Sequence, residues 1–110
     1  MLPDLSKTVF GSAALCTVKL SVHEDGSARR IQSDYRCQLR YGAAGADTDV
    51  RVYLVGQESA TSGEYIPVVL AFLDGDEQQD RCRPGTQFEL HEGARVTGTG
   101  TIHFVTGGYR

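Results

Sequence analysis

The chain has 110 residues and a mass of 11.9 kDa; 40% of its residues are hydrophobic, and 11 basic and 14 acidic residues give a formal net charge of −3. This length suffices for the core of one domain, and the composition excludes an intrinsically disordered chain. No apolar run reaches the ~18 residues of a transmembrane helix, so we expect no membrane association, and the net acidity excludes a general polyanion binder, so we expect no binding to DNA.

Apolar and polar residues alternate from residue 16 onward, which is the pattern of a half-buried strand. The pattern predicts a first strand over residues 16–23, whose buried face carries Cys16, Val18, Leu20 and Val22. A turn and loop follow over residues 24–34, with Asp25-Gly26 as the strongest turn signal. The next two strands are predicted at residues 35–41 and 49–55, with a flexible connection over residues 42–47.

The second half of the chain continues in the same way. A polar loop over residues 57–64 precedes a continuous apolar run, residues 65–73, which predicts a fully buried strand. Pro67 lies inside this run and is expected at the start of the strand or on a sheet edge, because proline has no backbone N–H. An acidic loop over residues 74–85 then closes on a Pro-Gly turn, and the last two strands are predicted at residues 86–92 and 94–104.

The last strand contains two glycines in its alternating pattern. Alternation places one set of residues inward (Val96, Gly98, Gly100, Ile102 and Phe104) and the other outward (Arg95, Thr97, Thr99, Thr101 and His103). Two successive inward glycines leave room where a strand bends sharply or another strand crosses closely. With six strands and no helical period, the sequence predicts an all-β closed barrel or sandwich.

The charged residues are unevenly distributed. Residues 29–40 hold one acid, Asp34, and four arginines: Arg29, Arg30, Arg36 and Arg40. Residues 58–92 hold eight acids and two arginines. Two interpretations stay open: a local basic face that binds an anionic partner, or two solvated faces of opposite sign.

The three cysteines, Cys16, Cys37 and Cys82, are an odd number at unrelated spacings. This usage argues against a disulfide framework and favours a reducing compartment, so a cytoplasmic location is expected. Arg81 and Arg83 flank Cys82, and neighbouring cations lower a thiol pKa. No partner base accompanies this cysteine in the sequence, however.

The motifs of common enzymes are missing from the sequence. The segment GARVTGTG has neither the lysine nor the following helix of a phosphate-binding loop, and the sequence contains no G-x-S-x-G, H-E-x-x-H or C-x-x-C. His23, His91 and His103 are all expected on polar strand faces, and no pair has metal-ligand spacing. We therefore expect no enzymatic activity, no metal and no cofactor.

Residues 88–102, FELHEGARVTGTGTI, resemble the last two strands of elongation factor Tu, whose third domain ends in a pattern like FAIREGGRTVGAGVV. The matching positions are Phe88, Glu92, Gly93, Arg95, Gly98 and Gly100, with Leu90 and Ile102 as conservative matches. His91 stands where the family has arginine, Ala94 stands where it has glycine, and Val96-Thr97 reverses the family order.

The resemblance extends backward in the right order, over residues 14–105. CTVKLSV is similar to the first strand of that domain, and YRCQLRYG is similar to its Y-R-P-Q segment, with Tyr35, Arg36 and Gln38 matching and Cys37 in place of proline. SGEYIPVVLAFL resembles a later strand of that domain, and Gly63 falls on the glycine of the family pattern. The resemblance implies a six-stranded antiparallel Greek-key β-barrel over residues 14–110, behind an N-terminal extension over residues 1–13.

In the family this barrel follows a GTPase domain and a second barrel, helps hold the T-stem of aminoacyl-tRNA, and touches the nucleotide-exchange factor. The present chain has no room for a GTPase domain, so no GTP binding is expected. The resemblance implies a non-enzymatic module that binds tRNA or a protein of the translation apparatus. The residues it implicates are Tyr35, Arg36, Gln38, Glu92 and Gly93, to which Arg29, Arg30, Arg40 and Arg95 are added for their charge.

Two alternatives remain open at this point. Gly93 with Ala94 is also interpretable as a plain hairpin turn, and Arg95 as the partner of a nearby acid on the barrel wall. A protein-interaction, inhibitor or immunity-type domain that retains only the barrel would also fit, because the acidic residues 74–80 suit a basic protein partner.

Overall fold

The structure, a computed structural model, describes residues 13–41, 48–72 and 83–106. Eight strands form in these ranges: β1 (Ala13–Leu20), β2 (Arg30–Gln32), β3 (Tyr35–Arg40), β4 (Thr48–Leu54), β5 (Ser59–Thr61), β6 (Tyr65–Phe72), β7 (Gln87–Glu92) and β8 (Arg95–Thr106). Some predicted features lie outside the described residues: nearly all of the N-terminal extension, the connection 42–47, the acidic residues 74–80, and Cys82.

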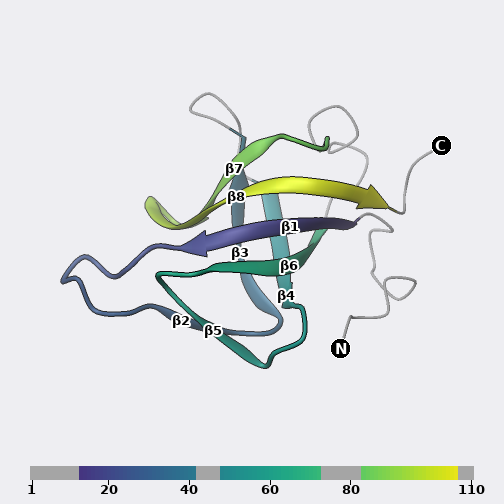
Figure 1. Cartoon of the computed structure of the whole chain (residues 1–110). Coiled ribbons are helices and arrows are strands. Elements are labelled where there is room, and N and C mark those ends of the chain that lie inside the picture. The colour runs from purple at the N-terminus through teal and green to yellow at the C-terminus, as the bar shows by residue number, and fades with distance from the viewer. Residues whose placement is uncertain (1–12, 42–47, 73–82, 107–110) are drawn as a thin grey trace.

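Six of these strands close into an antiparallel barrel in the order β1-β6-β4-β3-β7-β8, as Figure 1 shows. Strands β3, β4 and β6 follow one another along the sheet, while β1 returns beside β6, which is the Greek-key arrangement. The predicted all-β barrel with six antiparallel strands is thus confirmed. Closure also removes the exposed sheet edges on which small β-proteins aggregate.

The barrel interior is filled by the inward-facing residues of each strand. In β1 and β4 alternate side chains are buried, and the fully buried ones with the largest volumes include Phe72, Leu39, Leu70, Leu90, Ile102 and Val18. β6 is buried over most of its length, as its continuous apolar sequence predicts. The hydrophobic effect at these positions is the main driving force for barrel formation.

Pro67 occupies a place in β6 where its missing N–H breaks no ladder. It is the third residue of the strand, and the pairing of β6 with β4 ends at Val68, next to Pro67. The Pro67 carbonyl accepts a hydrogen bond from the Val55 amide, 3.2 Å away, beyond the end of β4. The Pro67 nitrogen therefore faces the end of β4, where the regular pairing has stopped and no N–H donor is needed, as at a sheet edge.

The strands β2 and β5 form a separate two-stranded ribbon at the lower left of the barrel in Figure 1. The sequence predicted loops at these positions, and that prediction is wrong. Each strand has only three residues, which is too short for alternation to be visible, and each is formed by long-range pairing such as that of Ile31 with Ala60. The first barrel strand also begins at Ala13 and ends at Leu20, three residues earlier than predicted.

The glycines of β8 permit the close approach of neighbouring atoms, as the sequence predicted. A Cβ atom at Gly100 would lie 2.5 Å from Cζ of Phe88 and 2.7 Å from the carbonyl oxygen of Thr17. At Gly98 it would lie 3.2 Å from the carbonyl oxygen of Lys19. Gly100 is therefore the position at which the Phe88 ring and strand β1 both contact the β8 backbone.

Two β-bulges in β8 overturn part of the predicted inward and outward assignment. The register with β7 shifts so that Leu90 pairs with Gly98 and His91 with Val96, which leaves Thr97 as the extra residue. The register with β1 shifts so that Leu15 pairs with Phe104 and Cys16 with Ile102, which leaves His103 as the extra residue. Because a bulge reverses the phase of alternation, Thr97 is fully buried and Phe104 is 59% exposed, the opposite of what regular alternation predicts.

Candidate functional site

The structure brings four of the predicted site residues into contact where β3 meets the β7–β8 turn. The Tyr35 hydroxyl donates to the Glu92 carboxylate and accepts from Thr97 Oγ1 at 3.1 Å. Nearby, the Gly93 amide donates to Gln38 Oε1 at 3.4 Å, and Gln38 Nε2 donates to Asp49 at 3.2 Å. Burial, and next the hydrogen bond to Glu92, raise the pKa of Tyr35 above its usual range.

Two of these contacts, Tyr35–Glu92 and Gly93–Gln38, join the Y-R-x-Q and E-G-x-R segments on which the family resemblance depends. Gly93 has φ 63° and occupies the left-handed position of the turn, which glycine adopts without strain. Arg95 ion-pairs with Glu24, with 3.4 Å between Nε and Oε1. The polar groups of Tyr35, Gln38 and Glu92 thus form hydrogen bonds within the protein, which fix the turn.

Arg29 and Arg30 lie side by side in sequence but have different environments. Arg29 is buried, with 5% of its surface exposed, and its Nε donates to the carbonyl of Ser21 at 2.8 Å. Its backbone N–H donates to Ser62 Oγ, so Arg29 joins the start of the small ribbon to the end of β1. Arg30 is exposed and donates to Ser59 Oγ at 3.0 Å, across the ribbon. Only Arg30 of the two is accessible to a partner.

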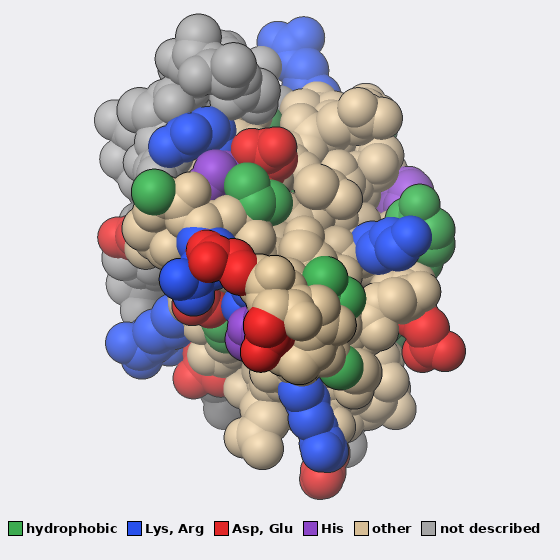
Figure 2. Space-filling view, turned by 90° about the vertical axis from the view of Figure 1, so that its left-hand side faces the viewer, with side chains coloured by type: hydrophobic (Ala, Val, Ile, Leu, Met, Phe, Trp, Pro, Cys, Tyr) green, Lys and Arg blue, Asp and Glu red, His purple; other side chains and the backbone are tan. Residues whose placement is uncertain are grey.

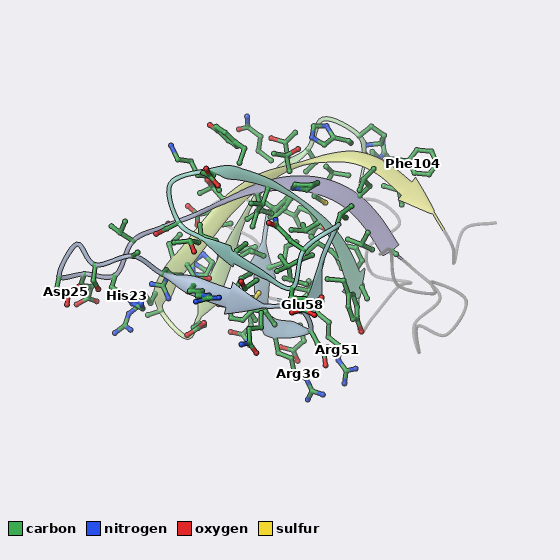
Figure 3. The ribbon with its side chains drawn as sticks, turned by 60° about the horizontal axis from the view of Figure 1, so that its bottom comes forward. His23, Asp25, Arg36, Arg51, Glu58 and Phe104 are labelled. Atoms are coloured by element: carbon green, nitrogen blue, oxygen red, sulfur yellow. The ribbon has the colours of Figure 1, made fainter. Side chains whose placement is uncertain are left out.

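Arg36 lies on the outer face of the barrel directly opposite Arg51, its Cα partner across β3 and β4. Both side chains point outward from the same region of the wall in Figure 3. Arg51 has Asp34 as a partner, with 3.8 Å between Nε and Oδ1, and Asp34 adopts the left-handed conformation with φ 70°. Arg36 is exposed and forms no ion pair within the described ranges.

Two like charges directly opposite each other on adjacent strands repel, and a bound anion would offset that repulsion. Arginine presents planar, paired donors that match a phosphate or carboxylate. The β3–β4 wall therefore contains an arginine pair, Arg36 and Arg51, to which Arg40 is added on the same face of β3, opposite Glu89. We call these three residues the arginine face.

One face of the molecule carries charges of both signs. Figure 2 views the molecule from the left-hand side of Figure 1, and basic and acidic side chains are interspersed over that face. This mixture of signs is in keeping with the net charge of −3.

The described cysteines are buried thiols. Cys16 and Cys37 are 1% and 2% exposed and form no disulfide. Burial raises the pKa of the Cys37 thiol to about 12, and the carboxylates of Glu92 and Asp49 add to the rise. Neither is the accessible thiol that nucleophilic chemistry needs.

His91 departs from the expectation that all three histidines are on the surface. It is 3% exposed, and its Nε2 lies 2.9 Å from Glu89 Oε1. Its Nδ1 is buried without a hydrogen-bond partner. Within the ranges that the structure describes, no group of three or more His, Cys, Asp and Glu side chains is placed to hold a metal ion, and no helix is long and apolar enough to cross a membrane.

Sequence reasoning found Arg36 and Arg40 but missed Arg51, Asp34 and Thr97. Arg51 was visible only as a polar residue on the outer face of a strand, and its position opposite Arg36 depends on the register of β3 and β4. Thr97 was assigned outward because the bulge that turns it inward leaves no local sequence signal.

A scan of the chain against protein-family models and a search of curated proteins both found no match.

Proposed function

We propose that this protein is a non-enzymatic binding module whose arginine face binds the phosphate backbone of tRNA or of another RNA of the translation apparatus. The observation that carries the proposal is the Arg36–Arg51 pair, two outward arginines opposite each other, one of which has no acidic partner in the described part of the chain. The resemblance of residues 88–102 to the third domain of elongation factor Tu supports the choice of RNA.

The barrel framework suits this role because it presents both side chains from paired strands. Residues on rigid strands keep their separation, so a phosphate can contact both arginines without an ordering cost in the backbone. Arg40, two positions further along the same face of β3 from Gln38, continues the track of donors. An RNA backbone that follows the wall would place successive phosphates along β3.

The test is the binding of fluorescently labelled bulk tRNA to the full chain, followed by anisotropy over a range of salt concentrations. We expect binding at low salt that weakens steeply as salt rises, because phosphate neutralisation releases counterions. Arg36→Ala with Arg51→Ala should weaken binding about tenfold or more and reduce the slope of log K against log salt by about two.

The matched control for the single variant Arg36→Ala is Arg83→Ala, because each removes one positive charge and Arg83 is exposed and precedes β7, outside the arginine face. An equal loss in this control would mean general charge attraction, and a DNA duplex that competes as well as unlabelled tRNA would mean the same. No retention of tRNA at low salt would refute the RNA proposal outright.

A second candidate function is the binding of a protein partner through an exposed apolar pair. Leu15 and Phe104 are 39% and 59% exposed and are Cα partners across β1 and β8. Large apolar side chains that are paired and exposed favour protein contacts. If this function holds, immobilised protein captures a stoichiometric partner from cell extract, and Phe104→Ser abolishes that capture while tRNA binding is unchanged.

A further inference from the structure

A hollow of about 670 Å³ lies on the outer wall of the barrel, over β7, β8, β1 and the start of β6. Its floor is formed by β8 and β1, neither of which is hydrogen-bonded to β3 or β4 in the barrel order. The hollow is thus centred away from the Arg36–Arg51 pair and adjoins the arginine face only through Glu89, the Cα partner of Arg40. Small-ligand sites in proteins have volumes of ~300–1,000 Å³, so this one has the size for a single small molecule.

The floor of the hollow is made of small polar residues. Thr17 and Thr101 are direct partners across β1 and β8, and Thr99 precedes them on the same face of β8. Gly100 lies between the two β8 threonines and adds no side chain. Each threonine hydroxyl can donate one hydrogen bond and accept two, so the floor offers a row of neutral groups of both kinds.

One wall of the hollow is the ring of Tyr65, of which 72% is exposed. The ammonium of Lys19 lies 5.4 Å from the ring centroid and holds one face of the ring. The other wall comes from β7, where Gln87 and Glu89 are the Cα partners of Thr101 and Thr99. An aromatic side chain and side-chain amide and carboxylate groups therefore border the hollow on either side of a hydroxyl-bearing floor.

The charges at the hollow select against ionic ligands. Glu89 lines the hollow and the Lys19 ammonium lies beside its Tyr65 wall, so one charge of each sign is present and neither phosphates nor carboxylates find a net positive site. A cation would meet the Lys19 ammonium beside the Tyr65 ring. His103 Nε2 lies 2.6 Å from Thr17 Oγ1, so this imidazole orients the floor hydroxyl. The chemistry that remains is that of a neutral ligand with many hydroxyl groups.

We propose that this hollow is a binding site for a neutral saccharide. The apolar C–H face of one sugar ring packs on Tyr65, because an aromatic ring offers a large apolar surface at small entropic cost. The sugar hydroxyls exchange hydrogen bonds with the threonines of the floor and with Gln87 and Glu89. Binding is weak, because the hollow is lined by few residues and the ligand pays for its lost hydration.

The experiment titrates the ¹⁵N-labelled full chain with neutral oligosaccharides, namely maltotriose, cellotriose, chitotriose and a galactotriose, each to ~10 mM. We expect at least one of them to shift the amides of Thr17, Thr99 and Thr101 in a saturable manner. Tyr65→Ala should weaken that binding at least tenfold. The matched control Phe104→Ala removes another exposed aromatic, outside the hollow, and should leave the affinity unchanged.

Three outcomes overturn the proposal: no saturable shift with any neutral sugar, equal binding of glucose 6-phosphate, or stronger binding of the nucleosides adenosine and uridine than of any sugar. Tyr65 is exposed, so its substitution does not threaten the fold, and the amide spectrum of the variant checks this directly. The double variant Arg36→Ala, Arg51→Ala should bind the sugar with the affinity of the parent protein. Loss of RNA binding and loss of sugar binding can therefore be measured independently.

Discussion

At the scale of single residues, Gly100 is the described glycine with the least room for a side chain. Its missing side chain leaves space for the Phe88 ring and for the carbonyl of Thr17, both closer than 3 Å to where a Cβ would be. Gly100→Ala should therefore lower the free energy of unfolding by about 2–3 kcal/mol, the range of overpacked cores. Urea denaturation followed by tyrosine fluorescence measures this loss.

Gly98→Ala is the matched control, because its Cβ would meet its nearest atom at 3.2 Å and needs only a small shift. It should cost about 1 kcal/mol or less. Phe88→Leu removes the ring but leaves the Thr17 carbonyl in place. Gly100→Ala should therefore cost less in a Phe88→Leu background than in the parent protein, but still more than zero. Equal costs at the two glycines would contradict the steric explanation.

At the scale of elements, the bulge at His103 decides what β8 presents to solvent. It turns Phe104 outward beside Leu15, whereas Phe88 in β7 is 3% exposed. Figure 3 shows Phe104 projecting from the end of β8, away from the barrel interior. Phe104→Ala should thus change the free energy of unfolding by about 0.5 kcal/mol or less, while Phe88→Ala should lower it by about 3–5 kcal/mol.

Thermal unfolding of the two alanine variants beside the parent protein distinguishes the two registers of β8. A loss of several kcal/mol in Phe104→Ala would mean that the phenylalanine is inside and that the strand continues without the bulge, as regular alternation predicts. In that register Val105 would be exposed, whereas in the structure it packs against the core.

The same strand explains which parts of the structure could be predicted from sequence. Six barrel strands are long enough to show alternation, so they were found, and the glycines of β8 marked a close crossing. The three-residue strands β2 and β5 have no such period. A bulge leaves a polar–apolar pattern intact while it shifts the phase, so the places of Thr97 and Phe104 depend on cross-strand pairing that sequence does not display.

The candidate site was predictable to the same extent. Arg36, Gln38 and Arg40 share one face of a strand, which alternation predicts. Their contacts differ because of register: Gln38 bonds to Asp49 and Gly93, while Arg36 lies opposite Arg51. Arg29, from the same arginine-rich segment, is buried because its guanidinium reaches the carbonyl of Ser21, a long-range contact.

At the scale of the whole molecule, the closed barrel gives two distant thiols a common protection. Cys16 in β1 and Cys37 in β3 lie on strands that do not pair with each other, yet both face the core. A closed ring of strands has no edge to open locally, so both thiols become accessible only when the barrel unfolds as a unit. In a Cys82→Ala background at pH 8, iodoacetamide should label Cys16 and Cys37 at one common, slow rate that rises in urea.

The raised pKa of Cys37 also makes the stability of the barrel depend on alkaline pH. Its pKa is about 12 in the folded protein against about 9 for an ordinary thiol, so between these values the unfolded chain releases a proton that the folded chain retains. The contribution of Cys37 to stability is therefore constant below pH 9 and is lost as the pH rises toward 12, at up to about 1.4 kcal/mol per pH unit.

Urea denaturation of the parent and of Cys37→Ala from pH 7 to pH 10.5 tests this. The difference between their free energies of unfolding should be constant up to about pH 8.5 and then shift in favour of the alanine variant. The tyrosines and lysines that titrate in the same range are common to the two proteins, so their contribution cancels in this difference. A difference that stays constant to pH 10.5 would mean that the Cys37 thiolate is solvated in the folded barrel, and the common protection of the two thiols would then fail as well.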